Sequence, residues 1–130
     1  MSDQPYEYYV HIVTKRYFHG IDNGDMELVM GCFHPHASLR EMSSNTLHDG
    51  YDAIREMFVG LFAAHSRIWH GNFVHTADTL ECAICSQFSV EVTSIKTHQL
   101  VRYESCNRFY LEDGKFRSIF VYLSGENLLK

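Results

Sequence analysis

Three polar residues occupy positions where the surrounding sequence pattern is apolar. Tyr17 lies on the apolar stripe of a predicted first helix, whereas Glu41 and Asn107 each alternate with apolar residues along a predicted strand. Unless a β-bulge reverses the strand faces, all three side chains would meet at one internal cavity. Because desolvation raises the pKa of a buried carboxylic acid, a carboxylate in such a cavity could act as a general base.

Each of these residues also has a purely structural interpretation. A tyrosine at this helix position can fill the core, and a glutamate at the end of a strand is often solvated. A buried asparagine can simply satisfy backbone groups, although an amide on an apolar face needs hydrogen-bonding partners. The pattern alone leaves both interpretations open.

Two of the nine histidines could add a proton relay. His70 and His75 fall on opposite faces of a predicted strand over residues 69–76, and the sequence does not say which face is inward. His34 and His36 lie in a predicted turn, where no acidic or cysteine partner stands at a metal-binding spacing, so we predict no metal site. The other five are expected at the surface or in loops: His11, His19, His48, His65 and His98.

The four cysteines are expected to be free thiols. Cys82 and Cys85 have C-x-x-C spacing, but they fall within a predicted alternating strand, where a spacing of three sends the side chains to opposite faces. The remaining two, Cys32 and Cys106, have no cysteine nearby in the sequence. We therefore predict no redox or metal-binding role for these thiols.

Three helices are predicted to precede the main run of strands. The first covers about residues 4–21 and stops at Asn23-Gly24, and Asp25 can cap a second, short helix that stops at His34-Pro35. A third helix follows Gly50. The predicted apolar stripes are, in chain order, Tyr6, Val10, Val13, Tyr17 and Ile21; Leu28, Val29, Cys32 and Phe33; and Ile54, Met57, Phe58, Leu61 and Phe62.

Most of the remaining sequence alternates with a period of two residues. Long strands are predicted over residues 80–92, 100–111 and 115–123, and Asp113-Gly114 forms a tight hairpin between the last two. Shorter strands are predicted over residues 37–42 and 69–76. Helices followed by an antiparallel meander predict an α+β fold, in which three N-terminal helices pack on a curved antiparallel sheet and leave an internal cavity.

The composition fits one globular domain. The 130 residues are 45% hydrophobic and 21% charged and contain no linker or repeat, so residues 1–130 are predicted to form a single domain. A net charge of −5 with scattered basic residues argues against nucleic acid and membrane as partners. No signal peptide or membrane-spanning pattern is present, which predicts a cytoplasmic protein, and phosphate-binding loops and nucleophile elbows are absent.

Motifs spread over most of the chain resemble one superfamily. They are Tyr17-Phe18, Gly24-Asp25, Phe33-His34-Pro35, Gly50-Tyr51-Asp52-Ala53-Ile54, Met57-Phe58, Asn107-Arg108-Phe109 and Asp113-Gly114-Lys115-Phe116. In this order they resemble the nuclear-transport-factor-2-like (NTF2-like) superfamily, and within it the SnoaL-like polyketide cyclases and ketosteroid isomerases. The resemblance implies a cystatin-like cone with a deep apolar pocket, and frequent homodimers formed through the outer face of the sheet.

The resemblance also implies catalytic roles. In the ketosteroid isomerases a carboxylate moves a proton at carbon, while a tyrosine and a protonated acid donate hydrogen bonds to the developing oxyanion. Tyr17 stands at the position of that tyrosine, Glu41 at that of the base and Asn107 at that of the acid. His70 or His75 facing Glu41 would resemble the histidine–carboxylate pair of related cyclases and dehydratases. The pocket residues expected are Phe33, Phe58, Trp69, Phe73, His75, Tyr103 and Phe109.

The sequence therefore predicts a SnoaL-like enzyme that needs no cofactor. It would perform acid-base isomerisation, cyclisation or dehydration on a small carbonyl or polycyclic compound. The expected partners are a small apolar or aromatic molecule and a second copy of the chain. Two alternatives stay open: a non-catalytic module that binds an apolar ligand in the same cone, and a dimerisation domain with a filled pocket.

Overall fold

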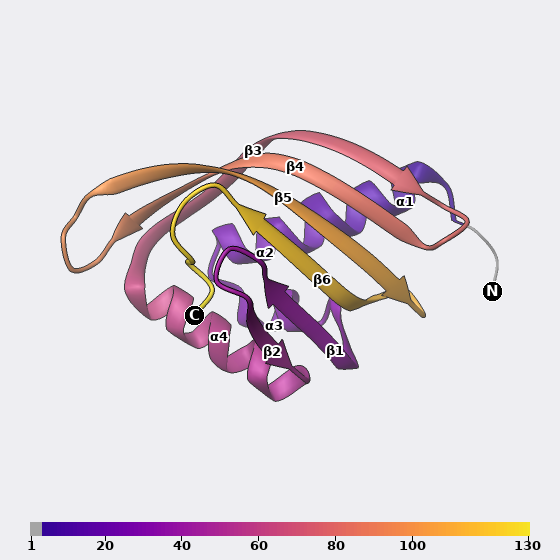
Figure 1. Cartoon of the computed structure of the whole chain (residues 1–130), viewed down its shortest axis with the longest axis horizontal. Coiled ribbons are helices and arrows are strands. Elements are labelled where there is room, and N and C mark those ends of the chain that lie inside the picture. The colour runs from indigo at the N-terminus through magenta and orange to yellow at the C-terminus, as the bar shows by residue number, and fades with distance from the viewer. Residues whose placement is uncertain (1–3) are drawn as a thin grey trace.

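The computed structural model describes residues 4–130, which form a layer of helices against one side of a curved sheet (Figure 1). The sheet has six strands in the order β2-β1-β6-β5-β4-β3. Neighbouring strands run antiparallel except β1 and β6, which are parallel. The predicted α+β fold, with helices on a curved sheet, is confirmed, and one parallel strand pair is added to it.

A continuous helical run begins the fold, as predicted. It consists of α1 (Tyr6–His11), the π-helix η1 (Ile12–Phe18) and α2 (His19–Asp22). Its buried face differs from the predicted stripe, because Tyr6 is 43% exposed whereas Tyr9 and Phe18 are buried. A π-helical turn holds more residues than an α-helical turn. Residues four apart therefore stay on one face of the run: Tyr9, Val13, Tyr17 and Ile21.

Two further helices follow, α3 (Met26–Met30) and α4 (Tyr51–Ala64). The predicted cap of α3 is confirmed, because the backbone N–H of Leu28 donates to Oδ1 of Asp25 at 3.1 Å. The buried residues of α4 belong to the predicted stripe and are Ile54, Met57, Phe58 and Leu61.

The predicted end of the second helix is wrong. Phe33 begins strand β1 (Phe33–Glu41), so His34 and His36 lie in a strand and not in a turn. The pairing of β1 with β6 shifts register between Phe33 and Ser38. Pro35 falls inside this irregular stretch, where a strand tolerates a residue without an N–H group. The short strand β2 (Thr46–Asp49), which pairs with β1, was not predicted.

The main sheet consists of β3 (His65–Asp78), β4 (Ala83–Ser94), β5 (Leu100–Glu112) and β6 (Lys115–Leu123). The predicted hairpin is confirmed, because Asp113 and Gly114 both have positive φ, at 54° and 74°. The predicted start of β4 is wrong, since Leu80 is 77% exposed in the preceding turn. From Ile84 onward the even-numbered residues of β4 face the helices, as the alternation predicts.

An aromatic cluster joins the helical run to the sheet. The Tyr17 ring lies between 4.9 and 6.2 Å from five phenylalanine rings, which belong to η1, α4, β1, β5 and β6: Phe18, Phe58, Phe33, Phe109 and Phe116. Such edge-to-face packing adds to the free energy gained by burying the rings. The cluster fixes the helical run over the inner face of the sheet.

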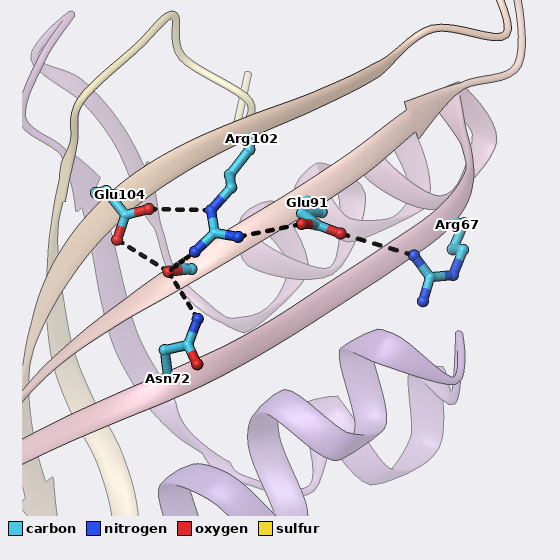
Figure 2. Close-up of polar contacts among 6 residues, drawn as sticks. Arg67, Asn72, Glu91, Arg102 and Glu104 are labelled. Atoms are coloured by element: carbon cyan, nitrogen blue, oxygen red, sulfur yellow. Dashed lines mark hydrogen bonds and ion pairs between the residues drawn. The ribbon is translucent and has the colours of Figure 1, made fainter.

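The outer face of β3, β4 and β5 carries a polar network (Figure 2). Ser89 is only 2% exposed although it lies on this face, because three side chains converge on its hydroxyl. Its Oγ donates to Glu104 at 2.9 Å and accepts from Arg102 at 2.9 Å and from Asn72 at 3.3 Å. Arg102 also reaches Glu91. The network ties three strands together, and the expected homodimer through this face stays a prediction.

No helix within residues 4–130 combines the length and the apolar character needed to cross a membrane.

A close contact between helices makes Gly20 sensitive to substitution. A Cβ at Gly20 would lie 2.9 Å from Cγ2 and 3.3 Å from the backbone N of Val29, so α2 and α3 would have to separate. We expect Gly20→Ala to lower the free energy of unfolding by about 1–3 kcal/mol. Gly60 of α4 is the matched control, because a Cβ there meets nothing within 4 Å. Gly60→Ala should raise the same quantity by about 0.5–1 kcal/mol. Urea unfolding measures both changes, and equal effects would contradict the packing argument.

Candidate active site

The helices and the inner face of the sheet line a narrow cavity of about 50 Å³. Its walls are mostly apolar, and they include four polar side chains: Tyr17 from η1, His70 from β3, and Ser105 and Asn107 from β5. Small-molecule sites usually measure roughly 300–1,000 Å³. The cavity as it stands therefore has room for only a few water molecules.

His70, which lines this cavity, is paired with Asp22 of the helical run. Nδ1 of His70 lies 2.6 Å from Oδ1 of Asp22, and the backbone N–H of His70 donates to Oδ2 at 3.1 Å. The side chains are 9% and 23% exposed. Asp22 ends α2 and His70 lies in β3, so this double contact also ties the helical run to the sheet.

The two contacts determine which nitrogen of His70 is basic. Because a carboxylate only accepts hydrogen bonds, Nδ1 carries the proton of the neutral ring and Nε2 has the free lone pair. The ring is held in place by Phe18 at 4.4 Å and Phe88 at 5.4 Å between ring centroids. An imidazole oriented in this way can accept a proton from a molecule in the cavity.

Asp22 was missed by the sequence analysis, although a physical signal was present. The negative end of the helix dipole disfavours an acidic side chain in the last turn of a helix. Asp22 is the last residue of α2, so its acidic side chain at this helix end could have indicated another interaction. From the sequence, Glu41 was a possible partner of either His70 or His75, whereas in the structure His70 pairs with Asp22.

The structure places Tyr17 at the cavity wall, as predicted. Burial, and secondarily the neighbouring Cys32, raise the pKa of Tyr17 far above its usual value, so its hydroxyl stays protonated. Within residues 4–130, every side-chain nitrogen or oxygen sealed from solvent has a hydrogen-bond partner. The Tyr17 hydroxyl makes no hydrogen bond with these residues, so it borders open space and is available as a donor.

Asn107 also lines the cavity and is only 3% exposed. Its Oδ1 lies 3.3 Å from the Ser105 hydroxyl, which can donate its single proton either to it or to the carbonyl oxygen of Tyr122 at 3.1 Å. With Oδ1 engaged in this way, the amide Nδ2 is the group that can donate into the cavity. Ser105 was not predicted, although its position two residues before Asn107 puts it on the same strand face.

Glu41 is fully buried, but it is not among the residues that line the cavity. Its carboxylate accepts from the Ser43 hydroxyl at 2.5 Å, and from the backbone N–H and hydroxyl of Ser44 at 2.9 and 3.2 Å. These bonds tie the carboxylate to the turn between β1 and β2. The structure thus does not bring Glu41 together with Tyr17 and Asn107 at the cavity, and its role as a base stays a prediction.

His75 lies outside the cavity lining, unlike His70. Its Nδ1 is 2.8 Å from the buried Ser86 hydroxyl, and its ring stacks on Phe73 at 5.5 Å with 13° between the planes. Burial lowers the pKa of His75 below its usual value. The structure therefore separates the two histidines between which the sequence could not choose.

The remaining predicted pocket residues are divided between the cavity wall and other places. Phe58 lines the cavity, whereas Phe33 and Phe109 are buried behind it against the Tyr17 ring. Phe73 packs against Phe18 and is not part of the lining.

Trp69 and Tyr103 are half-buried and also lie outside the cavity lining. Trp69 packs over Gly71. Tyr103 packs over Gly125, and its hydroxyl reaches Glu126 at 3.5 Å. Tyr103 thus contacts the segment that follows β6 instead of the cavity.

The structure gives His34 acidic neighbours that its sequence spacing did not reveal. His34, Glu112 and Asp113 could offer ligand atoms within 4.8 Å of one another. However, Nδ1 of His34 accepts the backbone N–H of His36 at 3.1 Å, so Nε2 must carry the proton, and it faces Glu112 at 3.3 Å. A ring in this tautomer has no lone pair left for a metal ion.

The cysteines are free, as predicted, but their arrangement differs from the expectation. Cys82 lies in a turn with φ of 52°, before β4 begins. Cys85 lies beside Cys106 of the neighbouring strand, with 3.1 Å between the sulfur atoms. Burial and the hydrogen bond with Cys85 raise the pKa of Cys106 to about 11, which leaves this thiol protonated at neutral pH.

Comparison with known proteins identifies the family. The SnoaL-like domain family matches residues 14–119, and the chain belongs to this family, within the NTF2-like superfamily. No curated protein sequence matches the chain.

Solved structures with low sequence identity share the fold. A candidate polyketide cyclase from Xanthomonas campestris pv. campestris has a TM-score of 0.80 at 15% identity, with 94% of this chain and 92% of that chain covered. A candidate isomerase from Bacillus subtilis has a TM-score of 0.81 at 13% identity, with 92% and 88% covered. AusH from Aspergillus nidulans has a TM-score of 0.80 at 12% identity, with 95% and 88% covered.

The lowered pKa of His75 predicts a pH-dependent stability. Because the folded state holds the neutral ring, the unfolded state binds more protons, and folding is favoured above the unfolded pKa of about 6.5. This contribution is lost as the pH falls below that value. We expect the free energy of unfolding to drop between pH 7.5 and 5.5, and to drop less in His75→Gln. Urea unfolding at both pH values tests this, with His11→Gln in the exposed part of α1 as the control. An equal drop in wild type and His75→Gln would refute it.

Proposed function

We propose that this protein catalyses cofactor-free acid-base chemistry on a small carbonyl compound, with His70 as the general base and Asp22 as its positioning residue. The observation that carries the proposal is the 2.6 Å contact between Nδ1 of His70 and Asp22 at the wall of an apolar cavity. A histidine paired with a carboxylate in this way has a defined tautomer, and it gains a stabilised cation when it takes up a proton.

The proposed reaction begins at the carbon next to the carbonyl group. Nε2 of His70 removes a proton from that carbon, and the electron pair of the broken C–H bond moves toward the carbonyl oxygen. The hydroxyl of Tyr17 and the amide of Asn107 donate hydrogen bonds to this developing oxyanion. If a C=C bond lies one carbon further along, the electron pair is delocalised over it, and the imidazolium returns the proton at the far end of that bond, which completes an isomerisation. If the compound carries a second carbonyl group, the enolate carbon attacks that carbonyl carbon and breaks its C=O π bond, and the imidazolium gives its proton to the alkoxide oxygen that forms, which completes a cyclisation.

The cavity supports this chemistry through its low polarity. Its lining is mainly aliphatic and aromatic, so a charge that forms there is poorly screened and each donor has a large effect. The same lining favours an apolar or aromatic substrate. The family and the polyketide cyclase and isomerase names of its structural neighbours support the same class of reaction.

Deuterium exchange can test the proposal before the substrate is known. A panel of cyclic and aromatic ketones is incubated with the protein in D2O, and mass spectrometry measures deuterium gained next to the carbonyl group. We expect wild type to accelerate exchange of at least one compound. His70→Asn should abolish this acceleration, and Asp22→Asn should reduce it by about 10²- to 10⁴-fold, because the tautomer is no longer enforced. Thermal shift checks that both variants still bind the compound.

Two further variants make the test specific. His75→Asn is the matched control, since it changes a histidine outside the cavity lining and should leave exchange unchanged. Glu41→Gln compares the two candidate bases: loss of exchange in this variant, with exchange retained in His70→Asn, would assign the base to Glu41 and overturn the proposal. Ligand-dependent stabilisation without exchange or product would instead support the non-catalytic binding module.

A further inference from the structure

His70, the base of the His70–Asp22 dyad, lines a cavity that is too small for an organic substrate. A volume of about 50 Å³ holds a few water molecules, whereas even a bicyclic ketone requires several times that space. Part of the wall must therefore move before a substrate can reach His70. The need for this movement rests on the proposed function, in which a substrate must reach His70.

Two side chains stand between the cavity and an outer groove. Leu61 of α4 and Leu128 line both the internal cavity and a groove of about 230 Å³ between α4 and the segment that follows β6. After β6 the chain turns back, and its end comes to lie near α4 (Figure 1). Leu128 belongs to this segment, residues 125–130, which we call the closing segment. Displacement of Leu128 would join the two spaces.

The closing segment is held by side chains alone. Among the described residues, no backbone-to-backbone hydrogen bond joins residues 125–130 to the rest of the fold. Nδ2 of Asn127 donates to the hydroxyls of Ser44 and Thr46 at 2.9 and 3.3 Å, and Nε2 of His48 donates to the Leu129 carbonyl oxygen at 2.8 Å. A segment attached by so few bonds can open locally while the sheet stays folded.

A second route is less suited to opening. Ile21 and Ile68 also line both the cavity and an outer depression of about 190 Å³. Ile21 belongs to α2 and Ile68 to β3, and these residues are only 4% and 7% exposed. Moving either would break helix or sheet hydrogen bonds, and it would disturb the neighbouring contact between Asp22 and His70.

We infer that Leu128 is the entry gate of the active site, and that the substrate is an apolar compound that passes between α4 and the closing segment and reaches from the groove to His70. Asn127 acts as the latch, because its two hydrogen bonds hold Leu128 against Leu61. A compound larger than the cavity would contact both the cavity wall and the groove once Leu128 has moved. The gate thereby favours larger compounds over smaller ones.

Binding of N-phenyl-1-naphthylamine, an uncharged fluorescent probe too large for a cavity of about 50 Å³, tests the gate without requiring turnover. In stopped-flow experiments the wild-type rate should level off at high probe concentration, because opening limits binding. Leu128→Ala removes the gate and should raise this limiting rate at least about tenfold. Asn127→Ala should raise it in the same direction, and it serves as a second variant that leaves the core leucines intact.

The control is Leu80→Ala. Leu80 is 77% exposed in the turn before β4 and lines neither the cavity nor the groove, so the same truncation there should leave the limiting rate at the wild-type value. Wild-type rates in both Leu128→Ala and Asn127→Ala would overturn the gate, as would acceleration in Ile68→Val alone.

Deuterium exchange tests the proposed reaction separately from the gate. If the two variants bind the probe faster but the wild type exchanges no ketone, the gate is supported and the proposed function is overturned. If the wild type exchanges a ketone but the probe rates of the variants are unchanged, the proposed function is supported and the gate is overturned.

Discussion

The contact between Asp22 and His70 joins the end of the helical run to the sheet, and the candidate site depends on it. The Asp22 carboxylate accepts two hydrogen bonds, from the ring and from the backbone N–H of His70, and these fix the distance between α2 and β3 at this point. They also fix the tautomer of a histidine at the wall of the cavity. The same two residues therefore connect the helical run to the sheet and form the candidate proton-transfer group.

The aromatic cluster around Tyr17 complements this joint. Five phenylalanine rings from both layers surround the Tyr17 ring, which positions η1 over β5 and β6. The hydroxyl at the edge of this cluster makes no hydrogen bond with the described residues and borders the cavity. A phenylalanine would supply the same ring packing, and the hydroxyl adds the hydrogen-bond donor that the proposed reaction requires.

The candidate site leaves little room for a ligand, and the arrangement of its walls explains why. The sheet curves over the helices, and the space that remains is divided by Leu61 and Leu128 into an inner cavity and an outer groove. Most of the wall belongs to helices and strands whose backbone groups are paired. Among the described residues, the closing segment has no such pairing with the rest of the fold, which is why we place the gate there.

The sequence by itself determined the fold, since helical and strand periodicities, the Asp25 cap and the Asp113-Gly114 turn depend on neighbours along the chain. It also placed Tyr17 and Asn107 on inward faces, because the helix and strand periodicities that orient them are local.

The sequence failed at Phe33, where a strand begins directly after a short helix. It also failed at Glu41, whose inward orientation did not reveal that nearby serines bind its carboxylate. Only the tertiary structure decided that His70 and not His75 lines the cavity, and that its partner is Asp22. These two residues lie 48 positions apart, and their contact depends on how a helix end docks on a strand, which no local pattern encodes.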